Sequence, residues 1–306
     1  MEQMGYKIKT FARQLFGDSG NELFHIHAGY QASAANGKTK FFEILHYVLG
    51  DYICKFDVGM LTAKHRIEPG KPMPEYQYWR AVRILYCTEP NHSDMLNSGI
   101  MKDLTGGEAI VYRMLYSNEV QKYRPMFKMH IMCNDPPQVD GSDSGVKRRI
   151  RKIDYISRFV DDAEVDVTQH MYKRDPHIIQ QFKDDDALKM EFLRLLLDHY
   201  VHEYEYEMPE VIKHSSLCYL EENDAIFKFT QDSVVKSDGA TLTLSDAKEA
   251  FRRSEHYNGK LATLKNDLIK ALRTPCHDFK RIDGKLFRNV FIGFKLAEAE
   301  GQDWRD

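Results

Sequence analysis

The chain has 306 residues, of which 42% are hydrophobic, and its formal net charge is −3. This length allows roughly two domains with cores of their own, and the charge argues against a uniformly basic surface for nucleic acid, so any such surface has to be local. Five widely spaced cysteines, the lack of a signal peptide and the lack of an apolar run approaching ~18 residues lead us to expect a protein of a reducing compartment that is neither secreted nor membrane-spanning.

The stretch 23–39 is the first informative part of the chain. It predicts a short buried strand, then a loop of small residues that ends in Asn36, Gly37, Lys38 and Thr39, then an amphipathic helix. This order is typical of a phosphate-binding loop. Backbone N–H groups and a helix N-terminus hold a triphosphate, the lysine reaches its β- and γ-phosphates, and the threonine hydroxyl ligates Mg²⁺.

The loop departs from the usual pattern at one position. The pattern G-x-x-x-x-G-K-S/T requires glycine at position 32, where this chain has Ala32. Alanine adopts positive φ less freely than glycine. The sequence therefore predicts the chemistry of the loop rather than its geometry, and leaves the effect of Ala32 on turnover open.

Two histidines lie in the strand that precedes this loop. His25 and His27 alternate, so both side chains point to the same face of the strand. Further ligands at a recognisable spacing do not accompany them. The sequence therefore does not predict a metal site there.

A second strand, residues 82–87, ends at Thr88 and Glu89. An apolar strand that presents a carboxylate at its end is the Walker B arrangement, in which the acid holds the Mg²⁺ shell and polarises the attacking water. Thr88 occupies a position that is often acidic, so Glu89 would have this role alone. An ordinary surface glutamate after a strand is the alternative.

Two β-prone runs flank the polar residues 117–124 and predict a hairpin with these residues at its tip. Lys122 and Arg124 would bind phosphates there, and Tyr123 between them would pack against a sugar or base. A solvated hairpin tip without a ligand is the alternative interpretation.

Two further features follow the hairpin. Asn134 ends the predicted strand 128–133, and an amide in this position can orient the water that faces the γ-phosphate. The basic run 147–152 contains Arg148 and Arg149, either of which could serve as an arginine finger for the nucleotide of a neighbouring subunit. A solvated basic face is the alternative.

The C-terminal half has a different character. After residue 161 the composition becomes acidic and helical, which predicts a small helical lid. From about residue 216, several helices precede a hairpin whose turn is predicted at Asp283-Gly284. This order favours a winged-helix-like domain that binds duplex DNA or a partner, and a purely packing role is the alternative.

The order of these motifs, together with K-x-L-T-G-G-E-x-I-x-x-R-x-L-Y at residues 102–116, resembles that of the superfamily 3 helicases. The resemblance is closest to the helicase part of the poxvirus-type primase–helicases of large DNA viruses. It implies an α/β fold with an AAA+-like P-loop NTPase core and a parallel central sheet at 1–160. A helical lid at 161–215 and a winged-helix-like domain at 216–306 would follow.

The resemblance also implies roles for individual residues. At the nucleotide it implies ATP binding by Asn36, Gly37, Lys38 and Thr39, Mg²⁺ binding by Thr39 and Glu89, and a sensor role for Asn134. Arg148 or Arg149 would be the arginine finger, and Lys102, Lys122, Tyr123 and Arg124 would bind DNA. The implied cofactors are ATP and Mg²⁺. The implied partners are single-stranded or forked DNA, further copies of the chain in a hexameric ring, and a primase domain on the same longer chain.

We therefore expect an ATP-dependent DNA helicase motor of viral DNA replication, acting in the host cytoplasm or at the replication site. One alternative is a nucleotide-binding module for DNA binding or assembly with little turnover, which Ala32 favours. Another is a P-loop enzyme of a different class, such as a small-molecule kinase. The predicted hairpin and the arginines after Asn134 count against that second alternative.

Overall fold

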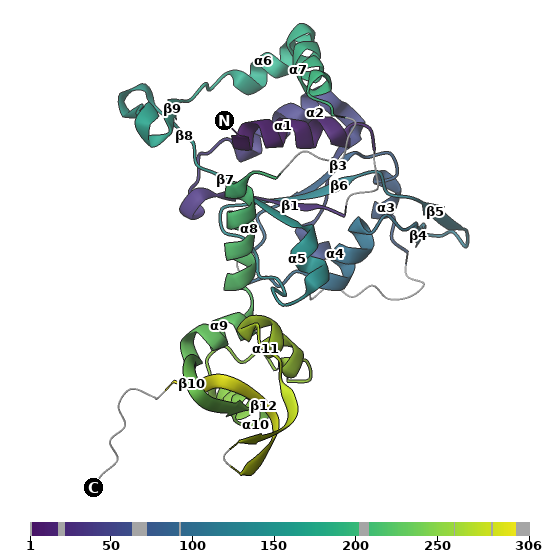
Figure 1. Ribbon diagram of the computed structural model, residues 1–306. Helices are drawn as coiled ribbons and strands as arrows, with labels where there is room; N and C mark the ends of the chain where they lie inside the picture. The colour runs from purple at the N-terminus through teal and green to yellow at the C-terminus, as the bar shows by residue number, and fades with distance from the viewer. Residues whose placement is uncertain are drawn as a thin grey trace. The chain divides into compact units, whose positions relative to one another are not determined.

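The computed structural model describes residues 2–17, 22–62, 72–91, 93–201, 208–259, 261–282 and 284–297. It consists of two compact units, residues 1–219 and 220–306, whose boundary lies inside helix α8 (Glu210–Glu222). Most elements of the two units are labelled in Figure 1. The division into a core, a lid and a C-terminal domain at residues 160 and 215 stays a prediction.

The first unit is built on a parallel sheet with the strand order β2-β3-β6-β1-β7. Parallel strands in such a sheet are covered on both faces and are therefore rich in apolar residues. In β1 and β6 all six residues are buried. The strands are β1 (Phe24–Gly29), β2 (Ile53–Lys55), β3 (Ile84–Thr88), β6 (Lys128–Cys133) and β7 (Ile150–Tyr155).

Helices cover this sheet on both faces, with α1 and α2 on one and α4 and α5 on the other (Figure 1). The α/β fold with a central parallel sheet is thus confirmed. The helices of the first unit that precede α8 are α1 (Glu2–Gln14), α2 (Lys38–Leu49), α3 (Glu75–Tyr78), α4 (Ser98–Thr105), α5 (Ser144–Arg149), α6 (Ile178–Asp184) and α7 (Asp186–Asp198). None of the helices in the described ranges is both long and apolar enough to cross a membrane.

The main core of the first unit lies between the sheet and the helices α1 and α2. Phe11 from α1 and Phe42 from α2 are fully buried, and their rings meet edge to face at 5.8 Å. Leu196 from α7 joins the same cluster. Helices α6 and α7 therefore pack against α2 and continue this hydrophobic layer.

Three histidines lie in this core, namely the two noted in the sequence and a third from β6. His25 and His27 from β1 and His130 from β6 are completely buried and stacked, with His25 and His130 ring centroids 4.9 Å apart. A nitrogen of His27 is 2.8 Å from one of His130, and the other nitrogen of His130 is 2.9 Å from Gln14. Both ring nitrogens of His25 are buried without a hydrogen bond.

Burial holds these imidazoles neutral. It lowers the pKa of His25 to about 3, with Arg151 and Lys128 contributing, and it lowers the pKa of His27 and His130 well below the usual value. The unfolded chain binds protons at these histidines below pH 6.5, whereas the folded chain does not. The contribution of these neutral histidines to the free energy of unfolding is therefore complete above pH 6.5 and is lost as the pH falls below it.

We expect the free energy of unfolding to fall by about 1.4 kcal/mol for each of these histidines between pH 7.5 and pH 5.5, or about 4 kcal/mol in all. Urea unfolding at the two pH values measures the fall. The variant His25→Phe keeps a flat ring against His130 and removes the two nitrogens that lack a partner. It should reduce the fall by about a third, and an unchanged fall in this variant would contradict the assignment.

Two small sheets extend from the first unit. The antiparallel pair β4 (Ile110–Arg113) and β5 (Val120–Tyr123) forms a hairpin. The parallel pair β8 (Arg158–Val160) and β9 (Met171–Lys173) follows β7. Its first strand is bound to the phosphate loop, because the Phe159 N–H donates to the Ala35 carbonyl at 2.8 Å.

The second unit has a sheet of order β10-β12-β11 in which both pairs are antiparallel. Its core includes Phe229, Phe251 and Phe291, all completely buried. Its elements after α8 are α9 (Ala225–Ser233), β10 (Val234–Thr243), α10 (Leu244–Arg253), α11 (Leu264–Leu272), β11 (His277–Ile282) and β12 (Lys285–Leu296). Of the predicted turn between the last two strands, Asp283 lies outside the described residues.

Candidate nucleotide site

The loop between β1 and α2 has a tightly wound backbone. Positive φ angles occur at Gln31 (51°), Ala32 (57°), Ala35 (56°) and Gly37 (79°). At Gly29 a Cβ atom would lie 2.0 Å from the Ser33 carbonyl oxygen, so only glycine fits there. Left-handed residues turn successive N–H groups toward one side, which makes a concave site for an anion.

Ala32 adopts the conformation that glycine would adopt, at the cost of strain between its Cβ and its own backbone. Replacing Ala32 by glycine should therefore raise the free energy of unfolding, by up to about 1 kcal/mol, because relief of strain exceeds the entropy that glycine adds to the unfolded chain.

Ala34 is the matched control, since its φ is not positive. Ala34→Gly should lower the free energy of unfolding by roughly 0.5–1 kcal/mol. Urea unfolding of both variants checks the pair, and an equal loss in both would show that Ala32 is not strained.

Lys38 is 4% exposed and lies where β1 and β6 end at the same edge of the sheet. Its ammonium donates to Asn36 Oδ1 at 2.9 Å and to Asn134 Oδ1 at 3.2 Å. Burial lowers the pKa of Lys38, and the nearby Cys133 and Glu89 oppose this shift. The predicted lysine, loop asparagine and sensor asparagine are thus brought into contact.

Glu89 follows β3 in the left-handed region, with φ at 53°. Its N–H donates to the Met132 carbonyl at 2.9 Å, which fixes it beside the end of β6. Both Glu89 and Thr39 are exposed. A carboxylate and a hydroxyl that are exposed near the Lys38 ammonium fit the oxygen ligands that Mg²⁺ prefers.

A second cation lies close to this loop. The Lys7 ammonium, from α1, is 4.1 Å from the centre of the Tyr155 ring, and the Lys38 ammonium is 6.0 Å from the same point. Burial lowers the pKa of Lys7 to about 8. Sequence reasoning missed Lys7 and Tyr155 because α1 and β7 meet only in the folded chain.

Arg148 and Arg149 differ in their surroundings, although they are neighbours in α5. Arg149 is buried, and its guanidinium donates to Thr105 Oγ1 and to the Gly145 carbonyl, each at 2.9 Å. It also pairs with Glu22 at 3.0 Å. Arg148 pairs with the second oxygen of Glu22 at 2.5 Å and keeps 62% of its side chain exposed.

Lys102 forms an ion pair with Asp143 at 2.8 Å. Asp143 also accepts hydrogen bonds from the Gly145 and Val146 N–H groups at the start of α5. Lys102 and Thr105 of the motif at 102–116 thus bind α4 to α5. The predicted DNA contact of Lys102 remains a prediction, and its observed contact is within the chain.

The predicted hairpin exists, but the placement of residues 117–124 at its tip is wrong. Lys122 and Tyr123 lie in the strand β5, which pairs with β4 rather than with β6, because residues 114–119 already form the turn. Tyr123 is buried, and its hydroxyl donates to the Tyr76 carbonyl at 2.8 Å, so it is corrected from a DNA contact to a packing residue.

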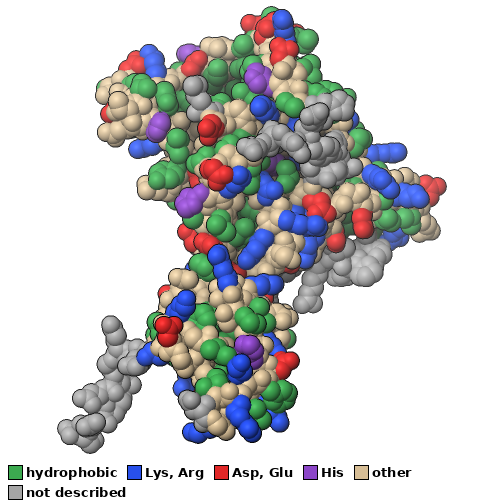
Figure 2. All heavy atoms as spheres, viewed as in Figure 1, with side chains coloured by type: hydrophobic (Ala, Val, Ile, Leu, Met, Phe, Trp, Pro, Cys, Tyr) green, Lys and Arg blue, Asp and Glu red, His purple; other side chains and the backbone are tan. Residues whose placement is uncertain are grey.

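The exposed aromatic residue of the hairpin is instead Tyr116, which is fully exposed in the turn beside Leu115. Lys122 and Arg124 are also exposed. Figure 2 shows basic and acidic side chains together around this projecting hairpin, so its charge is mixed rather than uniformly basic.

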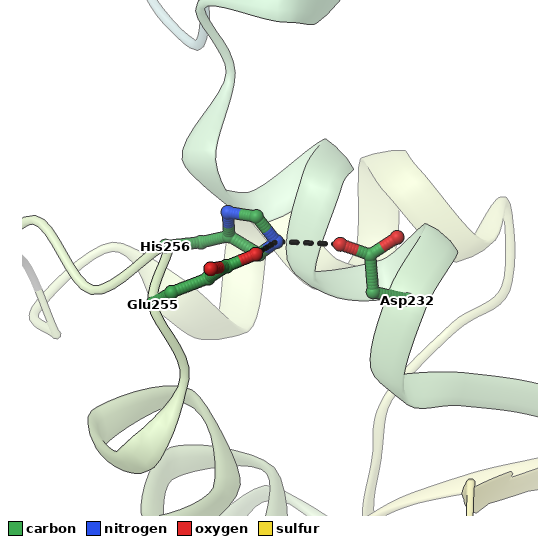
Figure 3. Close-up of side chains that lie close together, drawn as sticks. All are labelled: Asp232, Glu255 and His256. Atoms are coloured by element: carbon green, nitrogen blue, oxygen red, sulfur yellow. Dashed lines mark hydrogen bonds and ion pairs between the residues drawn. The ribbon is translucent and has the colours of Figure 1, made fainter.

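One group of possible metal ligands lies in the second unit. Within the described residues, Asp232, Glu255 and His256 are the group of His, Cys, Asp or Glu whose ligand atoms all lie within 4.8 Å (Figure 3). The His256 Nε2 atom is 2.5 Å from Asp232 and 3.7 Å from Glu255. This nitrogen is already hydrogen-bonded to Asp232. The contact therefore links α9 to the segment that follows α10.

The parallel sheet, the wound loop and the Lys38 contacts define the class of the first unit as a P-loop-like α/β core. No family model matches the chain. It is 29% identical over 274 residues to a protein of Acanthamoeba polyphaga mimivirus named "Putative helicase", covering 85% of this chain and 28% of that protein.

A second relative, of African swine fever virus, is named "Putative primase". It is 23% identical over 234 residues, which cover 74% of this chain and 24% of the relative. The chain thus spans about a quarter of the length of these relatives. They confirm the resemblance to the helicase part of the primase–helicases of large DNA viruses.

A solved structure, the apo C-terminal region of a protein named NrS-1, matches 95% of this chain and 71% of that one. Its TM-score is 0.46 and its sequence identity is 13%.

Proposed function

We propose that this chain is the ATP-driven motor of a superfamily 3 DNA helicase that acts in viral DNA replication, in the host cytoplasm or at the replication site. The observation that carries the proposal is the meeting of Lys38 with Asn36 and Asn134 beside Glu89, at the edge where the parallel strands end. This is the edge at which open α/β sheets bind their ligands.

In this proposal the loop N–H groups and Lys38 bind the phosphates of ATP, and Thr39 and Glu89 hold Mg²⁺. ATP supplies the phosphoryl group that is transferred to water. Asn134 positions that water through its amide, and its contact with Lys38 at 3.2 Å fixes the amide relative to the loop. Arg148 extends to the nucleotide of the next subunit in an AAA+-like hexameric ring.

DNA would pass along the β4–β5 hairpin, whose exposed residues include Tyr116, Lys122 and Arg124. Cations bind phosphates and an exposed aromatic ring stacks on bases, so this set suits a single strand. Helices α6 and α7 would form the lid, and the second unit, with its helices and antiparallel sheet, would be a winged-helix domain. A primase domain would belong to the longer chain that the relatives suggest.

The test is ATP hydrolysis at several protein concentrations, with and without single-stranded or forked DNA. The proposal predicts turnover that DNA stimulates and that rises more than linearly with protein concentration, since each site needs a neighbour. Full activity in a dilute monomer, or phosphate transfer to a small acceptor without effect of DNA, would overturn it.

The strained Ala32 supports a second candidate, a nucleotide-binding module for DNA binding or assembly with little turnover. It would bind ATP in an assembled ring without hydrolysing it. Because Ala32 already has the positive φ of a glycine, ATP turnover in the assembled wild-type ring separates the two candidates, and only the motor should show it.

A further inference from the structure

An exposed pair of aromatic side chains lies next to the phosphate loop. Phe159 and Tyr172 are neighbours across the β8–β9 pair, with ring centroids 6.4 Å apart. They are 41% and 36% exposed. Large aromatic side chains this exposed leave part of their apolar rings in water, and a flat ligand would cover them.

The position of this pair is fixed by the loop itself. The Phe159 N–H donates to the Ala35 carbonyl at 2.8 Å. Atoms of the Phe159 ring lie 2.8–3.7 Å from the point where a Gly37 Cβ atom would be. Gly37 directly precedes Lys38, so the ring touches the residues that would bind the phosphates. A base joined to those phosphates through a ribose is within reach of it.

From this placement we infer that Phe159 and Tyr172 form the stacking surface for the base of the nucleoside triphosphate. The inference rests on the proposed nucleotide-binding function and adds to it the site of the base. Stacking uses the π-face that every base has, so the site should accept adenine and guanine with similar affinity.

Ion pairs hold the two strands of this surface together. Arg174 pairs with Asp161 at 2.7 Å, and Lys173 pairs with Asp162 at 2.8 Å. The Arg174 N–H also donates to the Val160 carbonyl at 2.9 Å. The strand pairing and this hydrogen bond order the backbone under both rings before a base arrives, which reduces the entropy lost on binding.

The experiment compares the affinity of the full chain for Mg²⁺–ATP, Mg²⁺–GTP and inorganic tripolyphosphate, which has no base. Phe159→Leu keeps an apolar side chain against Gly37 and removes the π-face, and Tyr172→Leu does the same for the second ring. Each should weaken ATP and GTP binding about 5- to 150-fold and leave tripolyphosphate binding unchanged. Phe159→Trp, which keeps an aromatic ring at this position, should bind ATP with about the wild-type affinity.

Unchanged ATP affinity in both leucine variants would overturn the base site, as would an equal loss of ATP and tripolyphosphate, which would mean that Phe159 only supports the loop. If the wild-type chain binds tripolyphosphate and ATP equally well, the base site is absent while the phosphate loop stands. If it binds neither, the proposed function fails together with the inference.

Discussion

Replacing Lys38 by alanine should abolish ATP hydrolysis, with or without DNA. The change removes the only cation that contacts both Asn36 and Asn134 in the described part of the chain, and with it the charge that would offset the phosphates. Loss of one such donor costs at least about 100-fold in turnover. Phosphate release by Lys38→Ala and by Lys38→Met, which keeps the length of the side chain, measures the effect.

Lys40→Ala is the matched control. Lys40 lies two residues further along α2, is exposed, and pairs with Glu43 at 2.9 Å, so its loss should leave turnover within about two-fold. The Lys38 variants should also unfold no more easily than the wild type, because burial already disfavours the charged form of Lys38. An inactive Lys40→Ala, or an active Lys38→Ala, would remove the support for the P-loop assignment.

Replacing Arg148 by alanine should lower turnover in the assembled protein by about 1,000-fold or more, the effect of an arginine finger supplied by a neighbour. Folding should be preserved, because the Arg148 side chain is largely exposed and Glu22 keeps its ion pair with Arg149. Arg149→Ala should behave differently and lower the free energy of unfolding by about 2–4 kcal/mol, because Arg149 is buried with three partners. Arg194→Ala, on the exposed surface of α7, is the control.

Mixing inactive variants tests whether the finger acts between subunits. A Lys38→Ala subunit supplies Arg148, and an Arg148→Ala subunit supplies Lys38. If the two mix at random in a ring, about a quarter of the interfaces contain both residues and should hydrolyse ATP. No recovery in a mixture that demonstrably assembles would place the role of Arg148 within its own subunit.

The parallel sheet is predicted through the resemblance to the superfamily 3 helicases, and the short, apolar, buried strands β1, β3 and β6 agree with it. The contact of Lys38 with Asn134 follows from the same pattern, because parallel strands end at the same edge. Pattern and spacing are sufficient where the chemistry lies at strand ends.

Features that depend on long-range contacts could not be predicted in this way. The predicted hairpin tip is wrong because the position of the turn depends on the register of β4 and β5. In the observed register Tyr123 lies in β5 and its hydroxyl bonds to the Tyr76 carbonyl. Strand β10 begins at Val234, directly after α9, because pairing with β12 outweighs local helix propensity. The sequence also does not show which of Arg148 and Arg149 is buried. Arg149 is buried because it contacts Glu22 and Thr105, which lie far from it along the chain.

The shared carboxylate of Glu22 bears on how a ring could work. One oxygen of Glu22 pairs with Arg148 and the other with Arg149. If Arg148 moves away, Glu22 and the buried Arg149 therefore remain paired with each other. The buried contacts of Arg149 would keep the backbone at Arg148 in place during this movement. If Arg148 serves as the finger, its departure and return would cost little more than one ion pair at the surface, about 0–1 kcal/mol, so little of the free energy of ATP would be needed for this movement.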